Sequence, residues 1–467
     1  MTERWTKPPR VAVVGGGLAG LAAGCALAES GLHVTLFEKR PYLGGRASSY
    51  EHPGTGETLD NCQHVLLGCC TNLLEFYERL GVQQKIRWYD HLTFLEPGGR
   101  ASNIGPSFLP APFHTAPAFL KASCLNLQDK ISIAAAMAAL MPLVPDDNGE
   151  TFLSWLHRYG QTDQAINRFW KTILVSALNE DIDRVSVSYA AQVVRESFLK
   201  SSAAGKMGVP TVPLTDLYNV AGDYIASRGG EVRFRSGVDT FRTEFERVRL
   251  GTPDKEEAFD FAILAVPFDA LSRMLPDTTA AEPLRTTLDS FDSSPITGIH
   301  LWFDRKITDL DHAVLLDRTI QWMFHKSKLL GRNGDQPGSY LELVVSSSKS
   351  LVSKTRGEIV DLAVSELEEF FPEARTAKLL KSAVIKEVHA TYSPSPGIEV
   401  LRPRPETVWP RVFLAGDWTA TGWPATMEGA VRSGYLAAQC VARVAGVRNA
   451  AYLVPDLPPK GFMRLFG

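Results

Sequence analysis

One stretch near the N-terminus, residues 10–46, constrains the fold more than any other, and it reads RVAVVGGGLAGLAAGCALAESGLHVTLFEKRPYLGGR. Residues 11–14 form a short apolar run typical of a buried parallel strand, and Gly15, Gly17 and Gly20 follow at the G-x-G-x-x-G spacing. The first two glycines let backbone N–H groups approach a pyrophosphate, and Gly20 lets a helix over residues 18–29 pack closely on the strand. Because the helix N-terminus then faces the phosphates, the sequence predicts a dinucleotide-binding unit.

An acidic residue completes this unit. Gly31 ends the helix, residues 33–37 read as a second strand, and Glu38 follows roughly 20 residues after the glycines. A carboxylate at this point can accept hydrogen bonds from both ribose hydroxyls of an adenosine, and the neighbouring Lys39 is counted with the binding residues. A lone glycine triplet is often an incidental turn, but strand, turn, helix, strand and acid in this order favour a nucleotide site.

A second glycine pair, in Leu43-Gly44-Gly45-Arg46, indicates which dinucleotide is bound. A nicotinamide enzyme has no general need for this extension, which resembles the FAD-dependent amine oxidase and carotenoid desaturase superfamily. In that superfamily the arginine lies near the pyrophosphate and the flavin. The resemblance implies FAD as the cofactor and an α/β fold, with a Rossmann-like FAD-binding domain interleaved with an α+β substrate domain.

Composition excludes several classes of protein. A length of 467 residues allows about three domains, and 45% hydrophobic and 22% charged residues are ordinary for a soluble globular chain. A net charge of −3 argues against a nucleic-acid partner. Six scattered cysteines suit buried thiols in a reducing cytoplasm better than a disulfide scaffold or a metal site.

Targeting signals are also weak. Residues 1–10 are polar and lack the apolar core of a signal peptide. The longest apolar run, residues 131–145, is shorter than the roughly 18 residues that suggest a membrane span. We therefore expect a cytoplasmic protein, with peripheral contact to the inner face of the membrane left open.

The order of signals along the chain predicts a nucleotide domain that is interrupted twice. Its parts are residues 1–100, 210–275 and 405–446, and the insertions are a helical substrate- or membrane-facing region at 101–209 and a substrate domain with a sheet floor at 276–404, before a tail at 447–467. Residues 104–145 are so rich in proline, alanine and bulky apolar side chains that they must face a core, a partner, a lipid or a large apolar substrate.

Periodicity and turn residues predict the shorter elements. Helices are expected at residues 73–80, 152–159, 163–178, 216–227 and 358–371, a hairpin at 87–101, and strands at 231–234, 259–267, 298–303, 340–345, 384–388 and 412–415.

The later nucleotide-domain segments carry binding residues that the same superfamily resemblance implies. The backbone at Val238 resembles the position that meets adenine, and the strand ending in Gly416-Asp417 resembles the one whose aspartate binds the ribityl chain or pyrophosphate. The helix starting near Thr426 and Met427 is expected to point its N-terminus at the flavin, where its positive end would stabilise an anionic reduced ring.

Four further segments narrow the resemblance. DNCQHVLLGC (60–69), LPAPFH (109–114), ALNED (177–181) and DWTATGWPATMEGAVRSG (417–434) resemble the squalene-associated FAD-dependent desaturases, or hydroxysqualene dehydroxylases, of bacterial hopanoid pathways. The resemblance implies reductive removal of a hydroxyl from an apolar C30 isoprenoid to give squalene, with an electron donor that the sequence does not identify. One departure is Cys62, where the superfamily usually has glycine.

This reaction needs an acid, because hydroxide is a poor leaving group. The allylic cation that remains needs hydride from reduced FAD in a pocket that excludes water. His64 is the first candidate for the acid because its loop follows the segment expected near the flavin, and His114 and Glu180 are weaker candidates. Asp60 is expected to fix this loop or to orient His64, and either histidine could instead be an ordinary hydrogen-bonding residue.

Three other functions remain open. A carotenoid-desaturase-like enzyme would take hydride from an apolar polyene with the same FAD domain. An amine oxidase would need an aromatic cage, which Trp418 and Trp423 could form if they do not line an isoprenoid tunnel. A Rab-escort-like binding protein would share the fold without flavin chemistry, although the intact glycines, Arg46 and Asp417 argue against it.

Two segments are candidates for membrane contact. Residues 108–145 are apolar and interrupted by prolines, and the tail at 450–467 combines apolar with basic side chains. The apolar anchors of the tail would be Phe462, Leu465 and Phe466, and its basic residues are Lys460 and Arg464. The alternative is that the tail docks on its own domain.

Overall fold

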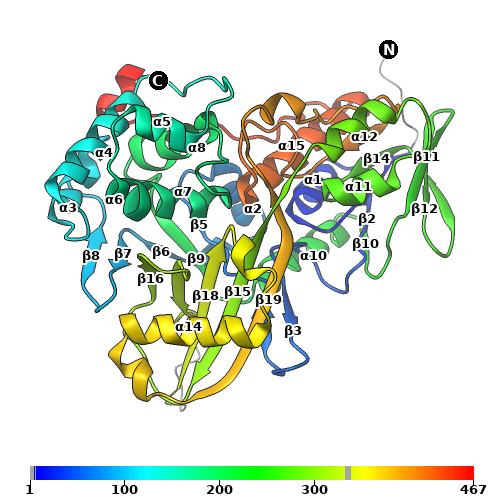
Figure 1. The fold of residues 1–467 in the computed structure, drawn as a ribbon. Helices are drawn as coiled ribbons and strands as arrows, with labels where there is room; N and C mark the ends of the chain where they lie inside the picture. The colour runs from blue at the N-terminus through cyan, green and yellow to red at the C-terminus, as the bar shows by residue number, and fades with distance from the viewer. Residues whose placement is uncertain (1–4, 6, 332–337, 467) are drawn as a thin grey trace.

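The computed structural model describes residue 5 and residues 7–331 and 338–466. Residues 1–4 and 6, part of the segment in which the sequence predicts no signal peptide, lie outside the described residues. A nucleotide-domain sheet, a long substrate sheet and a helical region lie side by side (Figure 1). None of the helices in the described part of the chain is both long enough and apolar enough to cross a membrane.

The nucleotide domain is built on a five-stranded parallel sheet in the order β10-β2-β1-β14-β20. Its strands are β1 (Arg10–Val14), β2 (His33–Phe37), β10 (Glu231–Arg233), β14 (Phe261–Leu264) and β20 (Val412–Leu414). The apolar runs predicted to be buried strands are confirmed, because helices cover the sheet and nearly every strand residue between β2 and β20 is shielded from water. The sheet thus joins residues more than 400 positions apart in sequence.

Helices α1 (Leu18–Glu29) and α15 (Met427–Val444) pack against each other beside this sheet (Figure 1). Small residues make the approach possible: a Cβ at Gly434 would lie 2.1 Å from the carbonyl oxygen of Ala19. The α15 helix begins with Thr426 as its N-cap, whose side chain accepts a hydrogen bond from the N–H of Gly429, as the predicted start near Thr426 requires.

One predicted helix of this domain is divided. Residues 216–227 were expected to form one helix, but the chain forms α9 (Leu214–Tyr218) and α10 (Val220–Ala226). The break falls at Asn219, whose Oδ1 accepts the backbone N–H of Leu43 at 3.2 Å. The amide side chain thus holds the second glycine loop, although Asn219 is also exposed to solvent.

Two small groups of elements border the nucleotide sheet. A three-stranded antiparallel sheet forms the far right of Figure 1, and two helices lie to its left. These elements are β11 (Thr240–Glu244), β12 (Arg247–Gly251), β13 (Glu256–Phe259), α11 (Phe268–Met274) and α12 (Glu282–Asp289).

The substrate domain rests on a seven-stranded sheet in the order β19-β15-β18-β17-β16-β7-β8. Its strands are β7 (Leu92–Leu95), β8 (Ala101–Ile104), β15 (Ser293–Phe303), β16 (His312–Leu315), β17 (Trp322–His325), β18 (Ser339–Ser346) and β19 (Leu379–Tyr392). All neighbouring pairs are antiparallel except β16 with β7. The helix α14 (Arg356–Phe370) packs on this sheet, so the strands predicted at 298–303, 340–345 and 384–388 and the helix predicted at 358–371 are present.

The predicted hairpin at residues 87–101 is wrong in its extent. Only β7 and β8 form the hairpin, whereas β6 (Ile86–Tyr89) pairs with β9 (Met207–Pro210) in a separate small sheet that also contains β5 (Leu66–Leu67). The strands β6 and β7 enter different sheets because the chain bends between them, at Asp90-His91. Propensity alone could not show that residue 87 pairs with a segment 120 positions later.

The helical region fills the left of Figure 1. Its elements are α3 (Ala116–Lys121), α4 (Leu127–Ala139), α5 (Phe152–Arg158), α6 (Asp163–Ala165), the π-helical turn η3 (Ile166–Trp170), α7 (Lys171–Leu178), α8 (Val187–Val194) and the π-helical turn η4 (Arg195–Leu199). The helix predicted at residues 163–178 is therefore interrupted by a π-helical turn. Such turns often occur at functional sites, and both of them border a cavity described below.

The C-terminal tail docks on the helical region. Its last element is the 3₁₀ helix η8 (Gly461–Phe466), in which the N–H of Phe462 donates to the carbonyl of Ala111 at 2.9 Å and Met463 is buried. Phe462 and Leu465 nevertheless stay 53% and 77% exposed. The tail is thus fixed to its own chain and still presents apolar side chains outward.

Smaller elements connect these parts. They are β3 (Ser49–Glu51), β4 (Thr58–Asp60), α2 (Thr71–Arg79), α13 (Lys326–Leu329) and the 3₁₀ turns η1 (Gln83–Lys85), η2 (Phe113–Thr115), η5 (Lys349–Leu351), η6 (Pro372–Thr376) and η7 (Glu399–Leu401).

Candidate active site

A cavity of about 690 Å³, here called the central cavity, opens at the carboxyl ends of the parallel strands and reaches the substrate sheet. The structure brings nearly all predicted cofactor-binding residues to its wall. These residues are Gly15, Gly17, Glu38, Lys39, Gly45, Arg46, Val238, Gly416, Asp417, Thr426 and Met427. Gly20 lies behind the wall, in the contact between helix and turn.

The glycine turn has no room for side chains. Gly15 has φ +108°, and a Cβ there would lie 2.4 Å from the carbonyl oxygen of Ala265. A Cβ at Gly20 would lie 1.9 Å from the carbonyl oxygen of Gly15, so only glycine permits this close packing. A Cβ at Gly45 would meet the Cα of Gly17 at 2.9 Å, which shows how closely the second glycine loop approaches the first.

Two helix N-termini face the central cavity. The α1 helix begins after Gly17, which has no side chain to cap the first-turn N–H groups, and Leu18 and Ala19 line the cavity. The α15 helix brings Met427 and Ala430 to the same wall. Exposed first-turn N–H groups and the positive helix ends suit a pyrophosphate and an electron-rich ring system.

Glu38 is fixed before any ligand arrives. Its Oε2 accepts the N–H of Gly16 at 2.7 Å, and its Oε1 accepts the N–H of Arg40 at 2.7 Å. Because each carboxylate oxygen has two lone-pair directions, both oxygens can still accept a ribose hydroxyl. The turn and the acid of the nucleotide motif are therefore locked to each other.

An ion pair joins two segments of the cavity wall. The Arg46 Nη2 lies 2.6 Å from Asp417 Oδ1, and its Nη1 donates to the carbonyl of Ala390 at 2.5 Å. Asn61 supports this arginine, since its Nδ2 donates to the carbonyl of Arg46 at 3.1 Å and to Glu387 Oε2 at 3.2 Å. The pair joins the second glycine loop to the third nucleotide-domain segment, as a site for one extended cofactor requires.

His64 also lines the central cavity, beyond the glycine loops. Its Nδ1 lies 2.7 Å from the carbonyl oxygen of Cys62. A carbonyl can only accept, so Nδ1 carries the proton and Nε2 of the neutral ring is a proton acceptor. Burial lowers the pKa of His64 below its ordinary value, which favours this neutral form at physiological pH. Among the described residues, nothing hydrogen-bonds Nε2.

The family model for flavin containing amine oxidoreductases matches residues 18–442 of this chain. The chain belongs to this family. Its cofactor is FAD, and it is a flavin-dependent oxidoreductase. The glycine turn, the fixed acid, the two helix N-termini and the Arg46–Asp417 pair fit that cofactor.

Curated relatives of this flavoprotein include carotenoid desaturases. A 15-cis-phytoene desaturase of Synechococcus elongatus is 27% identical over 92% of this chain and 95% of its own length. A 15-cis-phytoene desaturase of Arabidopsis thaliana is 28% identical over 94% of this chain and 81% of its own length, and a zeta-carotene desaturase of Synechocystis sp. is 26% identical over 92% and 97%. The relatives named here are not hydroxysqualene dehydroxylases.

Solved structures confirm the fold. A putrescine oxidase variant has a TM-score of 0.72 at 17% identity, covering 93% of this chain and 99% of that chain. A putative protoporphyrinogen oxidase from Exiguobacterium sp. has a TM-score of 0.66 at 19% identity, covering 95% and 99%. The predicted amine-oxidase-type architecture is therefore correct.

A buried ionic cluster lies behind the loop that carries His64. The Lys326 Nζ contacts Asp60 Oδ2 at 2.6 Å, Gln63 Oε1 at 2.8 Å and Glu342 Oε2 at 3.3 Å, and all four residues are buried. Asp60 Oδ1 also accepts Ser49 Oγ at 2.6 Å. These bonds match the predicted role of Asp60 in fixing the loop, whereas Lys326 is a partner that no sequence motif indicated.

The charged groups of this cluster shift one another's pKa values. Although burial opposes ionisation, the Lys326 ammonium holds the pKa of Asp60 below its usual value. Burial raises the pKa of Glu342 to about 7, against the attraction of the same ammonium. Lys326 and Asp60 are thus a buried ion pair, and Glu342 is the member whose charge changes near neutral pH.

Cys62, the departure from the superfamily pattern, is accommodated beside the cavity. Its side chain is 6% exposed and packs with Phe324 and Val344. Burial raises the pKa of its thiol well above the ordinary value, so the thiol stays protonated. The opposing strand provides space at Gly298, whose Cβ would lie 3.3 Å from the carbonyl of Asn61.

The two weaker acid candidates are not brought to the central cavity. Glu180 is fully buried, accepts Ser393 Oγ at 2.6 Å and pairs with Lys349. His114 lies in a different cavity, described below. Neither side chain lines the space that His64 and the glycine loops share.

The proposed aromatic cage is also not formed by the two predicted tryptophans. Trp418 is buried and its Nε1 donates to the carbonyl of Val266 at 3.0 Å. Trp423 packs under the Arg432 guanidinium at 4.7 Å. Instead Trp322 and Phe324, stacked at 5.6 Å on β17, line the cavity.

The sequence analysis did not assign two further residues, Asn179 and Trp322, to the central cavity. Asn179, from the ALNED segment, ends α7 with φ +52°, and its amide donates to the Ser294 carbonyl at 3.0 Å and to Thr391 Oγ1 at 2.9 Å. Trp322 stands in a strand that carries no recognisable motif. The only sequence signal for Asn179 is that asparagine readily adopts the left-handed conformation at the end of a helix.

Proposed function

We propose that this FAD-dependent oxidoreductase dehydrogenates a long acyclic isoprenoid. The part of the central cavity beyond the glycine loops is lined by Ile296, Trp322, Phe324 and Val344, side chains that suit a hydrocarbon rather than an amine. Relatives named as phytoene and zeta-carotene desaturases, which match over nearly the whole chain, support the same substrate class.

The observation that carries the proposed role of His64 is the hydrogen bond from its Nδ1 to the Cys62 carbonyl, which fixes the tautomer of the neutral ring. It leaves the neutral ring with a basic Nε2 at the cavity wall. Dehydrogenation removes a hydride from one carbon and a proton from its neighbour, so it needs a base at this place. When bound, FAD supplies the acceptor for the hydride.

The chain supplies the remaining requirements. His64 accepts the proton at Nε2, and the Cys62 carbonyl stabilises the imidazolium that forms. The apolar wall excludes water from the reacting carbons. An external two-electron acceptor must then remove the electrons, and neither a second dinucleotide motif nor any other feature of the sequence names it.

A second candidate is reductive dehydroxylation of hydroxysqualene, which the DNCQH, LPAPFH and ALNED segments favour. In that reaction a proton and the hydroxyl leave together as water, hydride forms the new C–H bond, and an external two-electron donor is consumed. His64 would then act as an imidazolium, the form that its lowered pKa disfavours. This lowered pKa and the desaturase relatives therefore favour dehydrogenation.

One anaerobic experiment separates the two reactions. Oxidised holoenzyme is mixed with phytoene or squalene, and dithionite-reduced holoenzyme with hydroxysqualene, while flavin absorbance is followed and products are identified by mass. We expect bleaching of the oxidised flavin and a product with two hydrogens fewer. Reoxidation by hydroxysqualene, with squalene as the product and no bleaching by the hydrocarbons, would establish dehydroxylation instead.

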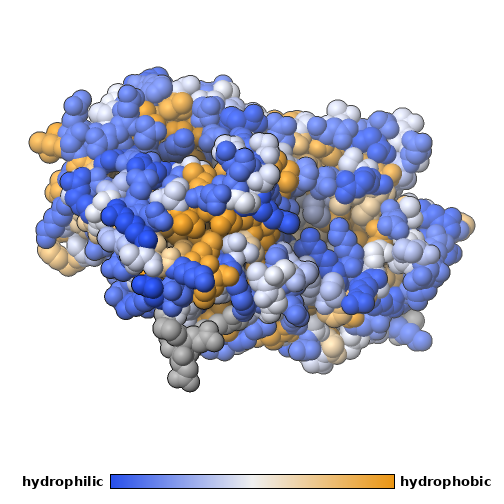
Figure 2. Space-filling view, turned by 60° about the horizontal axis from the view of Figure 1, so that its bottom comes forward, coloured by the Kyte–Doolittle hydropathy of each residue, from blue (hydrophilic) through white to orange (hydrophobic). Residues whose placement is uncertain are grey.

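We also propose contact with a membrane surface, because a long isoprenoid has negligible solubility in water. Exposed apolar side chains gather on the helical region and the tail: Phe108, Phe113, Leu120, Leu127, Ile131, Leu143, Phe462 and Leu465. Figure 2 shows apolar surface at the left side and in the centre of the face that it presents, beside strongly polar surface. Phe113 and Phe462 touch edge to face at 6.0 Å, so loop and tail form one patch.

A further inference from the structure

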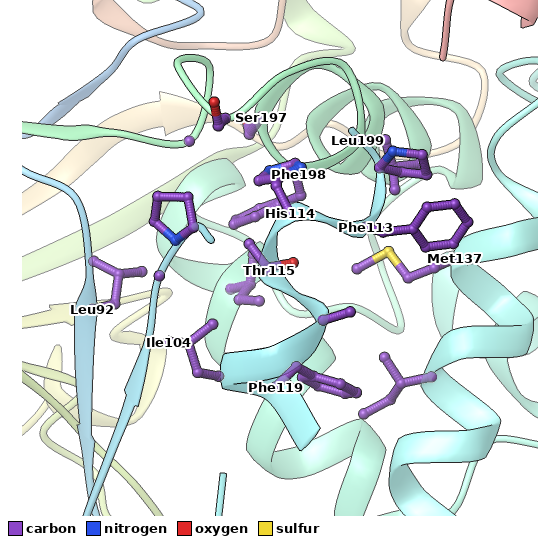
Figure 3. Close-up of a pocket in the computed structure, with 18 of the residues that line it drawn as sticks. Leu92, Ile104, Phe113, His114, Thr115, Phe119, Met137, Ser197, Phe198 and Leu199 are labelled. Atoms are coloured by element: carbon purple, nitrogen blue, oxygen red, sulfur yellow. The ribbon is translucent and has the colours of Figure 1, made fainter. Parts of the chain in front are cut away.

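A second cavity, here called the side cavity, lies within the helical region and has a volume of about 210 Å³. Its wall is mainly apolar and is formed by side chains of the helical region and of the strands β6, β7 and β8 beside it (Figure 3). Representative lining residues are Leu92, Ile104, Phe119, Met137, Ile173 and Phe198. Nothing in the proposed flavin chemistry uses this space.

One polar side chain stands among these apolar ones. His114 is 3% exposed and lines the side cavity, with its ring between the labelled Phe198 and Thr115 in Figure 3. Its Nδ1 is buried and has no hydrogen-bond partner among the described residues. Burial lowers the pKa of His114, so the ring is neutral. A buried, unpaired ring nitrogen is costly unless something occupies the cavity and bonds to it.

The nature of that partner is restricted by the charges nearby. The ionisable residues of the wall besides His114 are Tyr89, Asp90 and His91. The Tyr89 hydroxyl donates to Asp311 Oδ2 at 2.8 Å, and Asp90 pairs with Lys206 at 2.8 Å. No free cation faces the cavity from the described part of the wall, so an acid or a diphosphate would be unpaired there. A hydroxyl can both donate and accept, and therefore suits either tautomer of a neutral histidine.

The side cavity is close to the central cavity. Helix α7 contributes Ile173 to the side cavity, and one turn later Ser176 and Ala177 to the central cavity. The Nε1 of Trp322 donates to Ser176 Oγ at 2.7 Å across this boundary. Leu92 of the side cavity and Trp322 of the central cavity pack against the same small group of buried side chains.

The other end of the side cavity meets the exposed apolar patch. Phe113, half exposed, belongs both to the wall and to that patch. Leu120 and Ile131, on the helices that form the wall, are 63% and 62% exposed. A hydrocarbon leaving a lipid phase at this patch would therefore meet the side cavity before the central one.

We propose that the side cavity is a second binding site, which takes a neutral isoprenoid alcohol with its chain along the apolar wall and its hydroxyl on His114 Nδ1. The proposal rests on the isoprenoid substrate class proposed above but not on the direction of the redox reaction. It differs from that chemistry because it assigns a ligand to a cavity that the flavin site does not include.

The test is equilibrium binding of tritiated farnesol to oxidised holoenzyme, with farnesene as the matched hydrocarbon that lacks the hydroxyl. We expect farnesol to bind about fivefold or more tightly than farnesene, the scale of one buried hydrogen bond. His114→Phe keeps an apolar wall and should abolish this preference while farnesene still binds. His157→Phe, the same change at an exposed helix position, should preserve it.

A filling variant locates the site. Ala134 lines the side cavity and Ala135, the next residue of α4, does not. Ala134→Trp should weaken the binding of both ligands about tenfold or more, the order of a lost hydrophobic contact, whereas Ala135→Trp should leave it unchanged. FAD content should be normal in all variants, because none of these residues lines the central cavity.

The outcomes separate this proposal from the proposed function. If His114→Phe still binds farnesol more tightly than farnesene by the same factor, the hydroxyl does not bond to His114, and the proposal is overturned. Equal binding by Ala134→Trp and Ala135→Trp would place the ligand elsewhere and would overturn it too. If the binding pattern holds while neither phytoene, squalene nor hydroxysqualene reacts, the proposed function fails and the second site stands.

Discussion

At the scale of single residues, the state of His64 decides how the site can react. Its Nδ1 proton is committed to the Cys62 carbonyl, and burial lowers its pKa below the ordinary value. A base of this kind is active when neutral, so dehydrogenation should lose rate as pH falls through this lowered pKa and should be independent of pH above it. An acid with the same pKa would give the opposite profile, with the rate falling as pH rises.

We expect His64→Ala to retain FAD and to lower the turnover number about a hundredfold or more, the usual effect of losing a general base. Single-turnover flavin bleaching across pH 5 to 9, conducted on both proteins, measures the effect and its profile. The control is His157→Ala, because His157 is exposed on α5. If the flavin of His64→Ala bleaches as fast as that of the parent, a group other than His64 accepts the proton.

Glu342 should make the stability of the protein depend on pH. Burial raises its pKa from 4.5 to about 7, so the folded state prefers the protonated carboxyl. This contribution is fully present below pH 4.5 and is lost as pH rises through 7, with a total of about 3 kcal/mol. In Glu342→Gln, which is neutral at every pH, that loss should disappear.

Urea unfolding at several pH values, compared between the two proteins, isolates the effect of Glu342 and its coupling to Lys326, because groups remote from the cluster cancel. The exposed Glu373 provides the matched change, and Glu373→Gln should follow the parent curve. Parallel curves for parent and Glu342→Gln would mean that Lys326 keeps Glu342 ionised in the folded state. Sequence reasoning reached only Asp60 of this cluster, because Lys326 of α13 and Glu342 of β18 carry no motif and meet Asp60 of β4 only in the folded chain.

At the scale of secondary-structure elements, the close contact between turn and helix should be the least tolerant point of the FAD site. In Gly20→Ala the new Cβ would lie 1.9 Å from a backbone oxygen, so the helix must move away from the strand. We expect a loss of about 1 to 3 kcal/mol or more in stability, together with weaker FAD retention. Thermal unfolding and the ratio of flavin to protein after gel filtration measure both.

Gly357 offers the control for this change. It lies in the first turn of α14 with nothing within 4 Å of its Cβ position, so Gly357→Ala should be neutral or slightly stabilising. Normal flavin content in Gly20→Ala would contradict the prediction.

The same elements show how far sequence reasoning reaches. The strand, turn and helix of residues 10–29 were predictable because local periodicity and glycine spacing act within a few residues. The pairing of β6 with β9 was not, since register between distant strands is set by packing. Likewise, the motif residues were predicted to line the central cavity and do so. Trp322 was not predicted, because the sequence does not show which face of β17 points toward the cavity.

At the scale of the whole molecule, the apolar patch and the polar remainder of the surface predict reversible attachment to lipid. Phe462 and Leu465 of η8 project beside Phe113, while the exposed Lys460 and Arg464 stand on the same short helix or at its start. Apolar burial at the interface should supply most of the affinity, with about 1 kcal/mol from each basic residue near anionic headgroups. Attachment should therefore weaken with salt without disappearing.

The tail cannot simply be deleted to test this, because Met463 is buried and the tail holds the segment around Ala111. The double substitution Phe462→Ser with Leu465→Ser keeps the buried Met463 and the backbone bond to Ala111, and removes exposed apolar area together with the ring contact to Phe113. It should reduce co-sedimentation with anionic phospholipid vesicles about tenfold or more. The control is Phe245→Ser, since Phe245 is 97% exposed in the turn between β11 and β12, at the opposite end of the molecule from α3 and α4 (Figure 1). Equal binding by the double variant and the parent would exclude the tail from the membrane surface, and no binding by the parent would reject membrane contact altogether.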